Sequence, residues 1–151
     1  MIGVISDTHG LIRPEVFEMF KGVDLIIHAG DIGGVEVLSA LETIAPVKAV
    51  RGNNDRDSWA DHIPHDQVIK CGSHLFYVLH ELGHLDLDPV AAEFSAVIYG
   101  HSHRPLAETK NGVLYLNPGS AGPRRFSLPI SIARLHIEKS RLTPELIDLS
   151  V

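Results

Sequence analysis

Three short apolar runs alternate with two helix-like stretches in the first fifty residues, and this order constrains the fold more than any other feature. The apolar runs at 1–6, 24–30 and 47–50 are typical of buried strands. The stretches at 14–21 and 35–43 are typical of helices. The order strand, helix, strand, helix, strand predicts parallel strands joined by crossover helices, and therefore an α/β fold.

The second part of the chain is richer in strands. We expect strands at 67–71, 74–80, 96–100 and 113–117, a short helix at 88–94 and two amphipathic strands within 130–149. Pro144 would place the last of these strands at a sheet edge, because proline cannot donate a ladder hydrogen bond. No linker or internal repeat interrupts the chain, so we predict a single domain over residues 1–151. Two packed sheets with helices outside fit this count of elements best.

The bulk composition excludes several classes of protein. The chain has 151 residues, of which 44% are hydrophobic and 21% charged, which excludes intrinsic disorder. The formal net charge of −6 argues against an extended nucleic-acid-binding surface. The chain shows no signal peptide and no apolar run of the roughly 20 residues that a membrane helix needs, so we expect no membrane association. With its single cysteine, Cys71, this composition predicts a cytoplasmic protein.

Most of the unusual polar residues follow a predicted strand at its carboxyl end. They are Asp7, His9, Asp31, Asn53, Asn54, Asp55, His80, His101, His103 and Asn117. Ligand sites of α/β sheets gather at the carboxyl ends of parallel strands, so we expect these side chains to meet in space. Taken singly, most of these clusters also fit ordinary turns, and "GHSH" (100–103) is the strongest of them. Taken together, the clusters are poorly explained by turn chemistry, because all of them lie at strand ends.

The side chains of this set contain the donor atoms of a metal site. Imidazoles, carboxylates and amides without a thiolate exclude a Cys₄ zinc site, and the imidazoles exclude an all-oxygen calcium loop. This mixture suits Mn, Fe, Co, Ni or Zn better than Ca or Mg. The ligands are too many for one transition ion but suffice for two ions if one carboxylate bridges them. Two divalent ions with Asp7, Asp31 and a bridging hydroxide would sum to about +1, a charge that attracts an anion such as a phosphate ester.

Other enzyme signatures are absent. No phosphate-binding P-loop, dinucleotide-binding glycine motif or serine nucleophile elbow occurs. The first predicted strand is followed by Asp-Thr-His rather than by the Asp-x-Asp expected of an aspartyl-nucleophile phosphatase, so the nucleophile is expected to be water. The other histidines are assigned outside the site: His28 to the core, His62, His65, His74 and His136 to solvent, and His84 to a position near His80 without a role.

The order of these motifs resembles that of the calcineurin-like metallophosphoesterases. The motifs are Asp-x-His (7–9), Gly-Asp-x-x (30–33), Gly-Asn-x-Asp (52–55), a lone histidine after a strand (80) and Gly-His-x-His (100–103). The compact length and "LNPGS" (116–120) are similar to the small single-domain phosphodiesterases of bacteria and archaea. This resemblance implies a four-layer α/β-β/α sandwich of two mixed sheets flanked by helices, with the metal site at the strand ends.

The resemblance also implies how the ligands divide between two ions, for which manganese is the first candidate, followed by Fe, Ni, Co or Zn. One ion would take Asp7, His9, Asp31 and His103, and the other would take Asp31, Asn53, His80 and His101. A hydroxide between the ions would attack phosphorus. Many relatives carry a histidine that protonates the leaving group, but this chain has Asn54 there, which we expect to contact the phosphoryl group without donating a proton. Arg124 is a candidate for binding the substrate phosphate, and so are Arg104 and Arg125.

Three functions follow from this resemblance. The first is a dimetal phosphodiesterase that hydrolyses small phosphodiesters. The alternatives are a phosphomonoesterase of the same fold and a non-catalytic scaffold of the kind found in the retromer coat. All seven matched ligand positions hold residues able to bind metal, which favours an enzyme. The expected partner is a small phosphodiester substrate, and the sequence leaves a homo-oligomer open.

Overall fold

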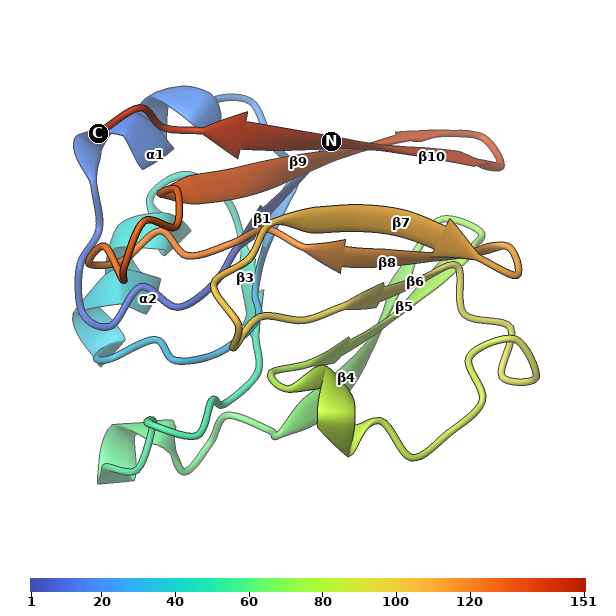
Figure 1. Cartoon of the computed structure of the whole chain (residues 1–151), viewed down its shortest axis with the longest axis horizontal. Coiled ribbons are helices and arrows are strands. Elements are labelled where there is room, and N and C mark those ends of the chain that lie inside the picture. The colour runs from blue at the N-terminus through green and yellow to red at the C-terminus, as the bar shows by residue number, and fades with distance from the viewer.

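Two five-stranded sheets pack face to face in the computed structural model, which describes residues 1–151 (Figure 1). The first sheet has the strand order β10-β9-β1-β2-β3. Its strands are β1 (Ile2–Ile5), β2 (Leu25–His28), β3 (Val47–Ala49), β9 (Ser131–Glu138) and β10 (Arg141–Asp148). β1, β2 and β3 run parallel, as their order along the chain predicted. β10 forms the edge of the sheet, as Pro144 predicted.

The second sheet is also mixed and has the order β4-β5-β6-β8-β7. Its strands are β4 (Asp66–Cys71), β5 (His74–Leu79), β6 (Ala96–Ile98), β7 (Leu106–Lys110) and β8 (Val113–Asn117). β5, β6 and β8 are parallel, and the antiparallel strands β4 and β7 flank them. The carboxyl ends of the parallel strands therefore lie at one edge of each sheet.

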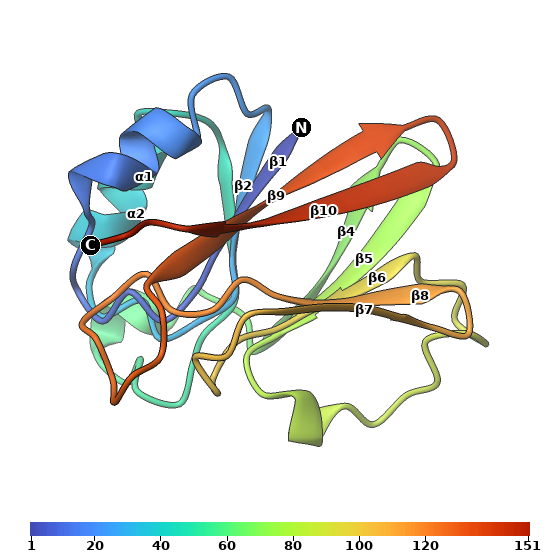
Figure 2. The ribbon, with the colours of Figure 1, turned by 45° about the horizontal axis from the view of Figure 1, so that its top comes forward.

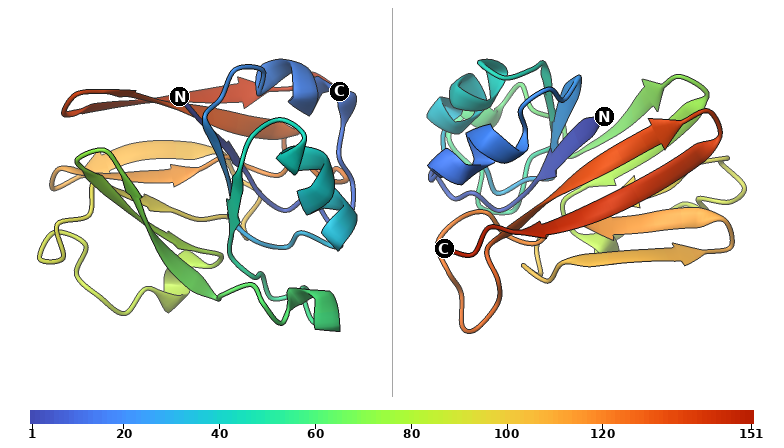
Figure 3. Two further views of the ribbon diagram at one scale, coloured as in Figure 1. Left: turned by 180° about the vertical axis from the view of Figure 1, so that it is seen from behind. Right: turned by 90° about the horizontal axis from the view of Figure 1, so that it is seen from above.

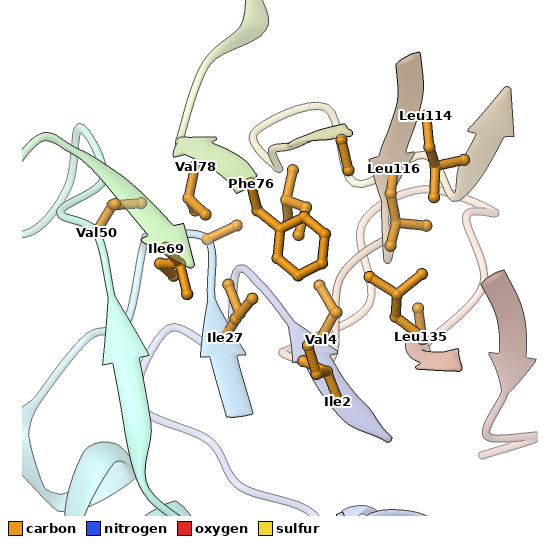
Figure 4. Close-up of a cluster of buried hydrophobic side chains, with 14 residues drawn as sticks. Ile2, Val4, Ile27, Val50, Ile69, Phe76, Val78, Leu114, Leu116 and Leu135 are labelled. Atoms are coloured by element: carbon orange, nitrogen blue, oxygen red, sulfur yellow. The ribbon is translucent and has the colours of Figure 1, made fainter. Parts of the chain in front are cut away.

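The core between the two sheets follows from the alternation of apolar residues along the strands. Side chains at every second position of a strand share one face. Ile2 and Val4 of β1 meet Phe76 and Val78 of β5 in this core (Figure 4). The cluster draws on both sheets, so the two sheets share one hydrophobic core.

Both α-helices cover the outer face of the first sheet (Figure 3). α1 (Pro14–Met19) and α2 (Val35–Glu42) bury Val16, Val37 and Leu41 against Ile5 and other strand residues. A Cβ on Gly3 would lie 2.9 Å from the ring of Phe20, so this glycine lets α1 and its C-cap lie close to β1. None of the helices is long and apolar enough to cross a membrane.

The outer face of the second sheet is covered by a loop that contains the 3₁₀ turn η2 (Leu82–His84) (Figure 2). Phe94 from this loop packs on Tyr77, with ring centroids 5.3 Å apart. The predicted helix over 88–94 is wrong, because a single turn follows Asp88 and Glu93 then adopts a left-handed φ of 62°. The predicted sandwich of two mixed sheets is confirmed, and its fourth layer consists of this loop.

Two further features differ from the sequence analysis. β7 is not predicted, because its five residues are all exposed and lack an apolar alternation. His74 is buried rather than solvated, since its Nδ1 lies 2.8 Å from the Ser95 hydroxyl and its Nε2 lies 3.0 Å from the carbonyl oxygen of Lys139. A second 3₁₀ turn, η1 (Ser58–Ala60), lies between β3 and β4.

Candidate metal centre

The predicted ligands come from loops that follow parallel strands in both sheets. Asp7 and His9 follow β1, Asp31 follows β2 and Asn53 follows β3 in the first sheet. His80 follows β5 in the second sheet, and His101 and His103 follow β6. Contacts between Asp7 and both His80 and His103 join the two groups, so the candidate site spans the junction of the sheets.

One cluster of ligand atoms surrounds the Oδ1 atom of Asp7. This oxygen lies 3.3 Å from His103 Nε2 and 3.9 Å from His9 Nε2. His9 Nε2 in turn lies 3.8 Å from Asp31 Oδ2. The structure therefore brings together Asp7, His9, Asp31 and His103, the four residues expected at the first ion.

A second cluster adjoins it through Asp31 and His80. His80 Nε2 lies 3.3 Å from Asp31 Oδ2 and 3.8 Å from Asp7 Oδ1. The His101 ring lies 5.3 Å from that of His80, but its Nε2 is 3.4 Å from Glu81 Oε1. Asn53 lines the same pocket as His80. Asp31 Oδ2 thus lies near one histidine of each cluster, His9 and His80, and Asp7 Oδ1 lies near the same two rings.

Two buried atoms of this site have no hydrogen-bond partner, namely Asp7 Oδ1 and His80 Nε2. The His80 ring donates its Nδ1 hydrogen to the carbonyl oxygen of Ala29 over 2.8 Å. This bond leaves the lone pair of the neutral ring on Nε2, directed at the two carboxylates. Buried polar groups are rarely left unpaired, and oxygen and nitrogen atoms with free lone pairs at one point fit a cation.

The backbone of the candidate ligands is strained. Five of the seven have a φ in the left-handed region: Asp7 (54°), His9 (47°), Asp31 (55°), His101 (73°) and His103 (62°). This conformation costs a residue with a side chain about 1–3 kcal/mol, and such strain concentrates at functional sites. Simple turn chemistry does not require it in so many neighbouring loops.

Both carboxylates are anionic at neutral pH. Burial raises the pKa of Asp31, but the nearby His80 imidazole and a hydrogen bond from the Asn54 backbone outweigh it and lower the pKa to about 2. The pKa of Asp7 is raised by burial and lowered more strongly by His103 and His80, so it lies below its usual range. Two ionised carboxylates in a buried site favour cation binding.

Glycines allow the loops to approach the carboxylates closely. A Cβ on Gly52 would lie 2.1 Å from Asp31 Oδ1, and one on Gly100 would lie 2.7 Å from Asp7 Oδ2. The glycines of the Gly-Asn and Gly-His motifs are therefore needed for packing against Asp31 and Asp7. Gly52 and Gly100 each come directly before a candidate ligand. Their close contacts therefore also position the backbone of Asn53 and His101.

A pocket of about 600 Å³ opens beside His80 and Asn53. Arg51 and Arg56 line it from the loop that follows β3, and neither is among the site residues predicted from the sequence. Each anchors its Nε by donating a hydrogen bond to a carbonyl oxygen, Arg51 to Ile63 and Arg56 to Asn53. Their only signal in the sequence is that they flank the Gly-Asn-x-Asp motif.

The pocket lining also contains carboxylates and imidazoles. Glu81 lies 3.2 Å from His84 Nε2, and Asp66 accepts a 2.5 Å hydrogen bond from the Tyr77 hydroxyl. Burial and the bond to Asp66 raise the pKa of Tyr77 to about 12. The lining is mostly polar and carries both charge signs, which fits a small polar substrate.

Two predicted substrate contacts lie in different surroundings. Asn54 donates from its backbone N to Asp31 Oδ1 over 2.9 Å and from Nδ2 to Asp31 Oδ2 over 3.2 Å, so it lies in the site. Arg124 is exposed and donates to the carbonyl oxygens of Leu128 and Val151. It makes no hydrogen bond or ion pair with any candidate metal ligand.

Comparison with known proteins identifies the family of this chain. The profile of the calcineurin-like phosphoesterase superfamily domain matches residues 1–140. The chain belongs to the calcineurin-like phosphoesterase superfamily. A probable metallophosphoesterase of Methanothermobacter thermautotrophicus is 35% identical over 97% of this chain and 91% of its own. A phosphodiesterase of Methanocaldococcus jannaschii is 30% identical over 78% of this chain and 82% of its own.

A solved structure shares the calcineurin-like phosphoesterase fold of this chain. Vps29 from Entamoeba histolytica, crystallised with zinc, superposes with a TM-score of 0.74 at 24% identity and covers 98% of each chain. At this identity the likeness shows the fold alone. The family model and the named relatives show that this member of the superfamily is a metal-dependent phosphoesterase.

Proposed function

We propose that the protein hydrolyses small phosphodiesters at a pair of divalent transition-metal ions, with manganese as the first candidate. The observation that supports this proposal is the meeting of two buried carboxylates, Asp7 and Asp31, with His9 and His80, where Asp7 Oδ1 and His80 Nε2 have no hydrogen-bond partner. Ions held there would supply an activated water molecule and neutralise charge on the phosphoryl group. The protein's own part is to hold seven ligands from two sheets in place and to keep both carboxylates ionised.

The pocket beside His80 and Asn53 is proposed to hold the organic part of the ester. Its volume of about 600 Å³ is within the usual range for small-molecule sites. Arg51 and Arg56 would orient the negatively charged diester from one wall, and their anchored Nε atoms reduce the entropy lost on binding. We therefore prefer these two arginines to Arg124 as substrate ligands.

In this proposal, the preference for diesters over monoesters depends on how the leaving group obtains its proton. Asn54 cannot supply a proton near neutral pH, and the missing acid would cost a factor of about 10² to 10⁴ for poor leaving groups. We infer that the enzyme acts best on diesters with good leaving groups. Phosphomonoesterase action is the nearest alternative.

The decisive experiment is a metal-dependence assay on bis(4-nitrophenyl) phosphate and 4-nitrophenyl phosphate. Protein stripped with EDTA should be inactive and should regain diesterase activity with two equivalents of Mn²⁺ per chain. The variant His62→Ala, at an exposed histidine outside the site, should respond identically. Folded protein that binds no metal and hydrolyses neither ester would instead support a non-catalytic scaffold.

A further inference from the structure

The Asp55 carboxylate is buried and is held by three backbone N–H groups. Its Oδ2 accepts hydrogen bonds from Ile32 and Gly52, and its Oδ1 accepts one from Gly33, each over 3.0 Å. The residue is 2% exposed. The three donors come from two different loops, those that follow β2 and β3.

These donors adjoin the two candidate ligands in those loops. Ile32 and Gly33 come directly after Asp31, and Gly52 comes directly before Asn53. One carboxylate therefore ties the loop of the candidate bridging ligand to the loop of the amide ligand. Asp31 has a left-handed φ of 55°, which the loop keeps only if its surroundings hold it.

The resemblance to related enzymes suggests another task for an acid at this position, namely orienting a histidine at position 54. This chain has Asn54 there, and its side chain donates to Asp31 instead. Asp55 is nevertheless fully engaged by backbone groups. Its burial and its three bonds thus serve the loops and not the neighbouring side chain.

We propose that Asp55 is a positioning residue that holds Asp31 and Asn53 at the spacing required for ion binding. This inference rests on the proposed two-ion site. Asparagine at position 55 would present its amide hydrogens to at least one of the three N–H donors. Asp55→Asn therefore removes an acceptor, turns an attraction into a donor–donor contact and keeps the side-chain volume.

The first test is Mn²⁺ titration of metal-free protein by calorimetry, comparing the wild type with Asp55→Asn and Asp55→Glu. Loss of a partner that orients a ligand typically lowers metal affinity by about 10- to 100-fold. We expect a loss of this size for the second ion, whose ligands include both Asp31 and Asn53. The first ion, which takes Asp31 but not Asn53, should lose less.

The second test needs no metal and no activity. Amide hydrogen exchange of Ile32, Gly33 and Gly52 should accelerate at least tenfold in Asp55→Asn, while the amide of Val50 should exchange as in the wild type. The Val50 N–H donates to the carbonyl oxygen of His28 and makes no hydrogen bond with Asp55. Unchanged protection of the three amides would overturn the proposal even if the two-ion site were wrong.

Two controls separate positioning from folding. Asp88→Asn changes another carboxylate that accepts backbone hydrogen bonds, from Val90 and Ala91, and should leave metal affinity unchanged. Phe94→Ala lowers stability from the cluster on the outer face of the second sheet, which contains no residue of the loops after β2 and β3. Equal loss of metal affinity in Phe94→Ala and in Asp55→Asn, at similar Tm, would show a general stability effect. A wild type that binds a single ion would contradict the proposed function and leave the exchange result to decide the role of Asp55.

Discussion

The imidazole Nδ1 of His80 lies 2.8 Å from the carbonyl oxygen of Ala29, so a hydrogen bond runs from a loop of one sheet to a loop of the other. The bond fixes both the tautomer and the direction of the ring. Its Nε2 consequently faces Asp31 and Asp7, the two carboxylates at the junction. Ion binding at His80 therefore depends on how the two sheets are docked.

Gly30→Ala tests this orientation. An added Cβ would lie 2.6 Å from His80 Nδ1, so the ring must move and metal affinity should fall about 10- to 100-fold. Gly22→Ala is the matched control, because Gly22 also has a positive φ (84°) and no neighbour within 4 Å of its Cβ position. Both variants should lose about 1–2 kcal/mol of stability to backbone strain. Equal metal affinity in the two variants would refute the role of the Ala29 bond.

Asn54→His should restore proton donation to the leaving group. We expect a gain of up to about 100-fold for diesters with poor leaving groups and little gain for nitrophenyl esters. The measurement is the dependence of kcat on leaving-group pKa. Asn54→Ala, which removes only the Nδ2 bond to Asp31, should retain metal and show the wild-type dependence. Parallel plots for Asn54→His and the wild type would contradict the prediction.

His28 should make the metal-free protein less stable as the pH falls. Its Nδ1 accepts a hydrogen bond from the Gly30 N–H, and its Nε2 lies 3.0 Å from the Thr8 hydroxyl. Burial lowers the pKa of this ring from 6.5 to about 4. Between these values the unfolded chain binds a proton that the folded chain excludes, so unfolding is favoured by about 3 kcal/mol in total.

Urea denaturation at pH 7.5, 5.5 and 4.5 in EDTA measures this loss of stability. The variant His28→Gln cannot titrate and should lose correspondingly less stability over the same range. The raised pKa of His80 acts in the opposite sense and above pH 6.5, where its stabilisation declines as the pH rises. Identical pH dependence of His28→Gln and the wild type would exclude His28 as the cause.

Metal removal should lower thermal stability as well as activity. An ion present at 100 times its Kd stabilises the folded state by about 2.7 kcal/mol, which corresponds to a Tm higher by about 5–10 °C in a domain of this size. Differential scanning fluorimetry with and without Mn²⁺ gives the shift directly. Asp31→Asn should lose most of it, because Asp31 lies between both clusters, whereas His62→Ala should keep it.

Arg56→Ala and Arg124→Ala distinguish two proposed substrate contacts. A charge-assisted hydrogen bond contributes about 1.5–3 kcal/mol, so Arg56→Ala should raise the KM for a diester at least tenfold. Arg124 donates to backbone oxygens of Leu128 and Val151 and contacts no candidate ligand, so its loss should leave KM unchanged. A raised KM in Arg124→Ala with an unchanged KM in Arg56→Ala would show that Arg124 binds the substrate instead.

The location of the site could be predicted from sequence because parallel strands present their carboxyl ends at one edge. Asp7, Asp31 and His80 each follow an apolar run, and topology then brings them together. The pocket arginines could not be found in this way. Arg51 and Arg56 reach the pocket only through the conformation of the loop after β3, which hydrogen bonds to Ile63 and Asn53 determine.

The fold was predicted where burial determines the structure and missed where it does not. β1 and β6 are short but wholly buried, and their apolar runs predict them from the sequence. β7 is an exposed edge strand whose residues match no pattern, and it forms because β8 offers it backbone partners. The left-handed backbone of the ligands also leaves no pattern in sequence, since Asp and His occur in many conformations.

The position of β9 in its sheet bears on how the chain is made. β1 leads into the first candidate ligands, yet it pairs along one edge with β9, whose residues 131–138 are synthesised after all of the candidate ligands. A nascent chain that has already produced every candidate metal ligand, through His103, still has an open edge on β1. Strand edges of this kind pair readily with other chains. The first sheet is therefore completed only after residues 131–138 have left the ribosome, and a chain cut short before β9 would carry all the ligands and be prone to aggregate.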